Sequence, residues 1–339
     1  MELIMNNLNV IWFILLCVLF AGFFLLEGFD YGTGILLPVI GKTDVERRQM
    51  INALGPIWDG NEVWMITAGG ALFASFPHVY ATLFSGFYMA LFLMLAVLIM
   101  RGVAFEFRSK SPNRTWRKVF DYCIFIGSIV PALLWGVTVG NLIQGTPIDE
   151  TMTYVGTFWD LLSPYTVLCG VAFILVFTYH GGLFTSLKTA GPVSERARAA
   201  ALVTGVPTAI GVIALIIASY VCTDLYNSTL AIVFCALAVV CFLISWGATR
   251  TRNTKWGFLF SSLSIILITA TYFAGLFPRI MVSSLNPAWS LTITNASSSE
   301  YTLALMTAVA AVFVPIVLAY QIWVYWIFRH RVTEKDLHY

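Results

Sequence analysis

Residues 9–39 read NVIWFILLCVLFAGFFLLEGFDYGTGILLPV, an apolar run interrupted by two carboxylates, Glu27 and Asp30. A helix of about 20 apolar residues crosses the roughly 30 Å hydrocarbon core of a bilayer. A carboxylate at the centre of such a helix costs about 2.5 to 3.5 kcal/mol on insertion scales, whereas one Leu or Phe contributes only about 0.3 to 0.6 kcal/mol. The run therefore predicts a membrane helix whose buried acids have a function.

The composition of the whole chain also indicates a membrane protein. Of its 339 residues, 59% are apolar and 11% are charged, against roughly 25% charged residues in an ordinary soluble domain. A net charge of +2 gives no indication of nucleic-acid binding. The six cysteines lie inside apolar runs without a CxxC pair, which favours buried thiols over metal ligands or disulfides.

Further apolar runs of spanning length follow the first one. The sequence predicts an all-α integral membrane protein with nine transmembrane helices, near residues 9–39, 55–76, 79–105, 118–138, 162–186, 202–223, 227–248, 256–280 and 303–328. The first run continues past signal-peptide length without a small-residue cleavage pattern, so we interpret it as a retained helix.

The basic residues predict how these helices are oriented. Five groups of Lys and Arg occupy alternate loops and the C-terminal tail: Lys42, Arg47 and Arg48; Arg108, Lys110, Arg114, Arg117 and Lys118; Lys188, Arg196 and Arg198; Arg250, Arg252 and Lys255; Arg329 and Arg331. The opposite loops carry Asp149, Glu150 and Asp224, or a Ser/Thr-rich run at 283–300. The positive-inside rule then places the N-terminus outside and the C-terminus in the cytoplasm.

A polar segment at 139–160 divides the chain into two sets of four helices that start from the same face. We therefore expect two four-helix bundles in parallel repeat plus a peripheral ninth helix. The expected parts are a first bundle with the acidic cluster at 1–138, an external connection at 139–160, a second bundle at 161–281, an external loop at 282–302, and the ninth helix with a cytoplasmic tail at 303–339. The sequence support for a repeat is one loose match, Glu27-Gly28 with His180-Gly181-Gly182.

A second acidic pair, Asp59 and Glu62, lies in the next run, GPIWDGNEVW at 55–64. Residues three apart share one face of a helix, so Glu27 with Asp30 and Asp59 with Glu62 each form a pair of carboxylates. Arg101 is the candidate counterion, because it is the one cation beside the apolar run of the third helix. Glu106 follows it toward the cytoplasmic end of that helix.

Two interpretations of these acids remain open. In the predicted orientation Asp59 and Glu62 lie near the cytoplasmic start of the second helix, and Asp30 lies about 18 Å beyond Lys42 at roughly 1.5 Å per residue. The acids then run inward from the cytoplasm and could pass protons. Alternatively, Arg101 and the carboxylates form a fixed ion pair that clamps helices one to three.

His180 is the one plausible ligand inside the membrane, in an apolar helix and followed by Gly181-Gly182. It would need an open pocket to bind a haem, and a hydrogen bond to a neighbouring helix is the favoured reading. The sequence has no phosphate-binding glycine loop, no metal-type spacing of Cys and His, and no hydrolytic triad pattern. The chain by itself does not look like a complete enzyme.

Several motifs together resemble those of one known family. They are EGFDYG at 27–32, GPIWDGNEVW at 55–64, ALFA at 71–74 with FP at 76–77, RGVAFEFR at 101–108, HGG at 180–182 with LKT at 187–189, NPAWSLT at 286–292 with NASSS at 295–299, and QIWVYW at 321–326. The chain resembles subunit II of the cytochrome bd quinol oxidases over essentially its whole length.

The resemblance implies a heterodimeric respiratory oxidase of the bacterial cell membrane, which oxidises ubiquinol or menaquinol and reduces dioxygen to water. The complex of that family holds two haems b and one haem d, with the haem ligands and the quinol-binding loop in subunit I. It generates a membrane potential without a pumping stroke, because protons are drawn from the inside and quinol releases its own outside. Small accessory subunits and a bound lipid or quinone are further partners that the resemblance leaves open.

The resemblance also implies roles for individual residues. The position of Asp59 is associated in that family with a cytoplasmic proton-uptake channel at the subunit interface, and Glu62 is our second candidate for this path. The positions of Asp30, Arg101 and Asp121 are associated with maintaining the haem centres. Glu27 and Glu106 match the motifs and are expected to be supporting polar groups.

Two other classes of function compete with the oxidase subunit. A proton-coupled secondary transporter also has parallel repeats and buried carboxylates, but it would purify colourless and alone. A purely structural scaffold would buttress a haem-bearing partner, with every polar contact a clamp. Substitution of the acids would make a scaffold lose haem and assembly together, whereas a proton path would lose turnover with the haems retained.

Overall fold

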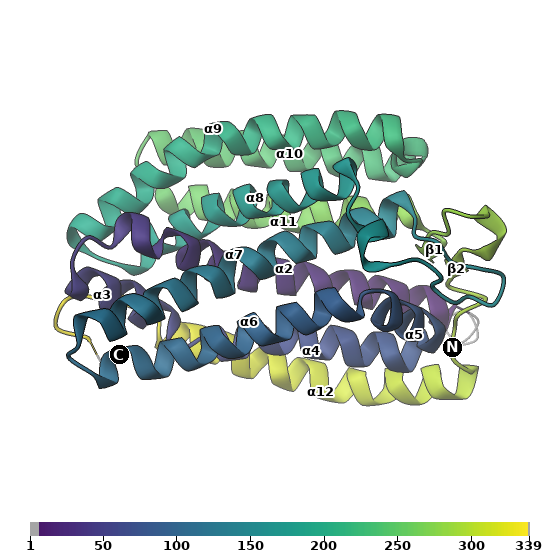
Figure 1. Ribbon diagram of the computed structural model, residues 1–339, viewed down its shortest axis with the longest axis horizontal. Coiled ribbons are helices and arrows are strands. Elements are labelled where there is room, and N and C mark those ends of the chain that lie inside the picture. The colour runs from purple at the N-terminus through teal and green to yellow at the C-terminus, as the bar shows by residue number, and fades with distance from the viewer. Residues whose placement is uncertain (1–6, 338–339) are drawn as a thin grey trace.

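The apolar runs of the sequence form long helices that lie along one axis in the computed structural model, which describes residues 7–337 (Figure 1). The helices are α2 (Leu8–Ile40), α3 (Asp44–Leu54), α4 (Trp58–Ser75), α5 (Pro77–Gly86), α6 (Tyr88–Phe107), α7 (Arg114–Gln144), α8 (Pro164–Lys188), α9 (Gly191–Cys222), α10 (Thr229–Arg250), α11 (Thr254–Leu276) and α12 (Glu300–Ile327). Short 3-10 helices are η1 (Arg108–Lys110), η2 (Phe158–Leu161), η3 (Leu225–Asn227) and η4 (Pro287–Trp289).

Within residues 7–337, eight helices are long and apolar enough to cross a membrane: α2, α6 together with η1, α7, α8, α9, α10, α11 and α12. The predicted all-α membrane class is thereby confirmed, apart from one short antiparallel pair of strands, β1 (Arg279–Met281) and β2 (Leu291–Thr292). The remaining predicted span, 55–76, corresponds to α4. Its 18 residues reach about 27 Å. Asp59, Asn61 and Glu62 make its first two turns polar, and the low mean hydropathy that results excludes it from the eight.

Some predicted boundaries were wrong. The third helix, expected at 79–105, is interrupted at Phe87 and forms two helices, α5 and α6. The helix expected at 202–223 begins at Gly191, where Pro192 occupies the first turn and needs no hydrogen-bond donor. The loop expected at 282–302 holds β2 and η4.

A polar helix, α3, begins at one end of the molecule, which we call the α3 end (Figure 1). Thr43 and Glu46 form a capping box at its N-terminus, each side chain bonding the backbone of the other. The Gln49 side chain of α3 donates to the carbonyls of Ala190 and Val332. The α8–α9 turn and the C-terminal tail therefore lie at this end, and β1 and β2 lie at the opposite one (Figure 1).

The centre of the molecule is a close contact between α2 and α8. A Cβ atom added at Gly32 would lie 1.8 Å from the carbonyl oxygen of Phe177, and one added at Gly181 would lie 2.4 Å from the backbone of Gly32. Only glycine permits this approach, which is how small residues bring membrane helices together. The side chain of Thr33 bonds Thr185 across the same contact.

α12 is set apart from this centre. It lies along α4 at one long edge of the molecule, opposite α9 and α10 (Figure 1). Only 6% of its most apolar segment is buried. Two indole N–H groups of neighbouring helices form hydrogen bonds to α12. Trp12 of α2 donates to Thr307 at 3.0 Å, and Trp64 of α4 donates to Gln321 at 2.8 Å.

Candidate functional site

Three helices bring a buried ion cluster together around Arg101. Arg101 of α6 is fully buried, and its Nη1 lies 2.5 Å from Glu27 Oε1 of α2 and 3.1 Å from Glu62 Oε1 of α4. The guanidinium carbon also lies over the rings of Tyr31, at 5.0 Å, and of Phe105, at 5.2 Å. Arg101 is therefore the counterion of two carboxylates that are far apart in the sequence.

The cluster is only partly satisfied by its own side chains. Glu27 Oε2, Asp30 Oδ1 and the Nε and Nη2 groups of Arg101 are buried and have no hydrogen-bond partner in the described part of the chain. Unpaired polar groups are costly in an apolar interior and mark sites where proteins keep polar chemistry. Glu27 and Asp30 therefore each keep one carboxylate oxygen without a hydrogen-bond donor among these residues.

Asp30 has a different partner from Glu27. Asn61 Nδ2 of α4 donates to Asp30 Oδ2 at 2.8 Å, and the Tyr325 hydroxyl of α12 donates to Asn61 Oδ1 at 2.7 Å. This chain of hydrogen bonds connects three helices. The sequence analysis predicted no role for either Asn61 or Tyr325. The amide of Asn61, a polar side chain inside an apolar run, could have indicated a buried hydrogen bond.

The exposure of the acids decreases from the surface to the centre. Asp59 is exposed, and its side chain has no ion pair or hydrogen bond within residues 7–337. Glu62, one turn further along α4, is 23% exposed, whereas Glu27 and Asp30 are fully buried. Glu62 thus lies between an exposed acid and the buried ones. Glu106 is exposed on α6 and takes no part in the Arg101 cluster.

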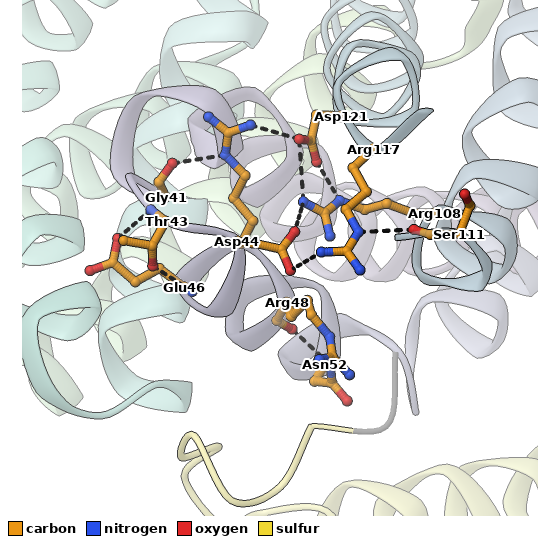
Figure 2. Close-up of polar contacts among 11 residues, drawn as sticks. Gly41, Thr43, Asp44, Glu46, Arg48, Asn52, Arg108, Ser111, Arg117 and Asp121 are labelled. Atoms are coloured by element: carbon orange, nitrogen blue, oxygen red, sulfur yellow. Dashed lines mark hydrogen bonds and ion pairs between the residues drawn. The ribbon is translucent and has the colours of Figure 1, made fainter. Parts of the chain in front are cut away.

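Asp121 lies in a second cluster, at the α3 end (Figure 2). Asp121 of α7 accepts from Arg108 Nε at 2.5 Å and from Arg47 Nη1 at 2.7 Å. Asp44 of α3 pairs with Arg108 at 3.1 Å and with Arg117 at 2.8 Å. This network joins α3 to η1 and α7. The resemblance associates Asp121, like Asp30 and Arg101, with maintaining the haem centres. In the structure Asp121 lies in a cluster separate from that of Arg101.

His180 is buried with both ring nitrogens in use. Nδ1 lies 2.9 Å from the Ser261 hydroxyl, and Nε2 lies 3.2 Å from the carbonyl of Leu25, to which it donates. The ring is stacked on Phe258 with centroids 4.7 Å apart. In this arrangement His180 has no nitrogen available for a haem iron. Within residues 7–337, no group of three or more His, Cys, Asp or Glu could hold a metal.

Comparisons with known proteins add the family context. The family model described as cytochrome bd terminal oxidase subunit II matches residues 8–328. The chain is 40% identical over 334 residues to cytochrome bd ubiquinol oxidase subunit 2 of Bacillus subtilis (strain 168), covering 98% of this chain and 99% of that protein. It is also 40% identical over 365 residues to cytochrome bd-I ubiquinol oxidase subunit 2 of Escherichia coli (strain K12), covering 97% and 96%.

A solved structure has the same fold. A chain from the structure of the bd oxidase of Geobacillus thermodenitrificans superposes with a TM-score of 0.75, covering 95% of this chain and 98% of that one. The sequence identity is 18%, so this likeness concerns the fold alone.

Proposed function

Because this chain belongs to the cytochrome bd terminal oxidase subunit II family, we propose that its acids form a proton-uptake path within that oxidase. The chain is a multi-pass subunit of a quinol oxidase in the bacterial plasma membrane and takes part in respiratory electron transport. Membership of an oxidase family leaves the secondary transporter without support.

The path begins at Asp59 and continues through Glu62 to the Arg101 cluster. The observation that supports it is the stepwise burial along α4 and α2: Asp59 is exposed, Glu62 is 23% exposed, and Glu27 is fully buried. One guanidinium faces Glu27 and Glu62. A proton that reaches Glu62 neutralises its carboxylate, and Arg101 then forms an ion pair with Glu27 alone. Proton transfer and ion pairing are therefore coupled.

The direction of the path follows from a proposed topology. We assign nine passes, with α4 as the second, the N-terminus outside and the C-terminus in the cytoplasm. α4 runs along the same axis as α6 and α12 (Figure 1), and Arg47, Arg108 and Arg117 lie at the α3 end, as the positive-inside rule expects of a cytoplasmic face. The bundles are α2, α4, α6 and α7, and α8 to α11.

The remaining parts of the oxidase are assigned to its partner. Subunit I would hold two haems b and one haem d and oxidise ubiquinol or menaquinol, and these groups supply the electron transfer to dioxygen. His180 does not fit a haem, because both of its ring nitrogens are engaged. Its contribution is to hold and move protons at the carboxylates of Asp59, Glu62 and Glu27.

Removal of the Asp59 carboxyl group tests this path. In the two-subunit complex, Asp59→Asn should lower quinol-driven oxygen consumption at least about tenfold, in line with the contribution of positioned proton-transfer groups, while the haem absorption spectrum stays normal. Glu195→Gln is the control, because Glu195 is a 61% exposed carboxylate on α9. Unchanged oxygen consumption of Asp59→Asn across pH would rule out its role in proton entry.

The scaffold remains the second candidate, because the Asp121 network is a set of ion pairs that only joins helices. It predicts that haem and assembly are lost together on substitution of the acids. If Glu62→Gln and Asp121→Asn, which lose ion pairs, lost their haem spectra in proportion to activity while Asp59→Asn stayed fully active, the scaffold would be the better description.

A further inference from the structure

A cavity of about 290 Å³ lies between α2, α8, α11 and the C-terminal end of α12. Phe29, Phe184 and Phe258 contribute to its apolar walls, with Tyr325 and Phe328 on the α12 side. An apolar cavity of about 150 Å³ is already large enough to bind benzene, so this one has room for a longer hydrocarbon. Apolar cavities stay dry and bind apolar molecules, so the walls favour a hydrocarbon occupant.

Two cations line the same cavity, Lys188 at the end of α8 and Arg329 just after α12. The Lys188 ammonium donates to the carbonyls of Phe328 and His330. The Arg329 guanidinium lies 4.4 Å over the ring of Trp326 and donates to its carbonyl at 2.6 Å. Neither cation pairs with a carboxylate in residues 7–337, so two positive charges beside an apolar cavity lack an anion.

The position of the cavity indicates the source of that anion. Lys188 and Arg329 lie at the α3 end, where a bilayer has its headgroups, and α12 is little buried by the rest of this chain. Basic pockets between transmembrane helices bind anionic lipid headgroups. A quinone has an apolar tail but no charge, so it would leave both cations unpaired.

We propose that this cavity binds one anionic phospholipid, with an acyl chain between Phe29 and Phe258 and the phosphate against Arg329 and Lys188. The acyl chain packs against Tyr325, whose hydroxyl reaches Asp30 through Asn61. The lipid therefore fills the space between a weakly packed helix and the centre of the molecule.

The test measures lipid retention by the purified two-subunit complex. The complex is stripped of lipid in detergent and incubated with phosphatidylglycerol or with phosphatidylcholine of the same acyl chains, and native mass spectrometry counts the lipids that remain bound. We expect one phosphatidylglycerol per complex in preference to phosphatidylcholine. Arg329→Gln should reduce that preference about fivefold, as expected for one Lys or Arg near a membrane surface.

Matched variants separate the charge from the cavity. Arg331→Gln removes an exposed cation two residues away that does not line the cavity, and it should keep the preference. Ser262→Phe fills the cavity without changing charge and should abolish retention, whereas Leu259→Phe, on the exposed side of α11, should not.

Three results would overturn the assignment. The first is equal retention of the two lipids by the unmodified complex. The second is identical behaviour of Arg329→Gln and Arg331→Gln. The third is recovery of a quinone from the unmodified complex and from Arg329→Gln, but not from Ser262→Phe. This result would show that a neutral molecule occupies the cavity.

Discussion

Arg101 is the residue on which the buried cluster depends. It is fully buried, and it holds Glu27 at 2.5 Å and Glu62 at 3.1 Å through the same nitrogen. Removing one partner of a buried ion pair typically costs about 3 to 5 kcal/mol, whereas removing both is often neutral. The cluster can therefore be examined for function separately from stability.

Arg101→Gln alone should lower the yield and the thermal stability of the haem-bearing complex, because Glu27 is left charged and buried. The double substitution Arg101→Gln with Glu27→Gln should restore part of the lost stability, because Glu62, which is 23% exposed, still lacks its counterion, and it should not restore turnover. Yield, denaturation temperature and oxygen consumption per haem measure these effects, with Lys118→Gln on exposed α7 surface as the control. A double variant with normal turnover per haem would show that the pair is only a clamp.

Glu46 gives the fold a pH dependence outside the membrane. Burial raises the pKa of this carboxyl. The ion pair with Arg196 at 2.5 Å and the backbone N–H groups of Thr43 and Lys42 lower the pKa by more than burial raises it, so the pKa in the folded state is below its usual value. A lowered folded pKa means that the stabilisation is present above the unfolded value of about 4.3 and is lost as pH falls through the folded pKa.

Glu46→Gln should therefore destabilise the complex by about 1 kcal/mol or less near neutral pH. The difference from the unmodified complex should vanish in acid, because Glu46 is then protonated in both states. Thermal denaturation at about pH 7 and at a pH well below the unfolded value of about 4.3, beneath the lowered folded pKa, measures this. A difference that grows on acidification would contradict the assigned sign.

At the scale of elements, α12 is attached to the site by a single hydroxyl near its C-terminal end. Tyr325 donates to Asn61, which donates to Asp30, and such a net hydrogen bond contributes about 0.5 to 1.5 kcal/mol. Tyr325→Phe should reduce turnover with the haems retained, because Asp30 and Asn61 lose their fixed geometry.

Tyr320→Phe is the matched control for that variant. It removes a hydroxyl from the same helix at a residue that is 62% exposed. Oxygen consumption per haem should fall for Tyr325→Phe and stay unchanged for Tyr320→Phe. Equal activities of the two variants would show that the hydroxyl does not position Asp30.

The sequence predicted most helices because apolar runs of spanning length have few alternatives in lipid. It did not predict the break at Phe87 or the start of α9 at Gly191, because neither is marked by a change in hydropathy. It suggested Arg101 as counterion from charge alone. The sequence could not predict the hydrogen bond of Tyr325 to Asn61. The two residues lie 264 positions apart, and only the packing of α12 on α4 brings them together.

At the scale of the whole molecule, two kinds of ionic cluster occupy different depths. The Asp121 network lies at the α3 end and joins helices there (Figure 2). The Arg101 cluster lies among α2, α4 and α6, and its Glu62 is 23% exposed and lies one turn from the exposed Asp59. This separation is consistent with a structural role for the first cluster and proton transfer through the second.

The most direct test of proton entry at Asp59 follows the protons themselves. Complexes are oriented in vesicles, and proton uptake from the cytoplasmic side is recorded after a pulse of oxygen to the quinol-reduced enzyme. The proposed path predicts that Asp59→Asn slows this uptake together with turnover while the haem spectrum is intact. Proton uptake at the unmodified rate in Asp59→Asn would contradict it.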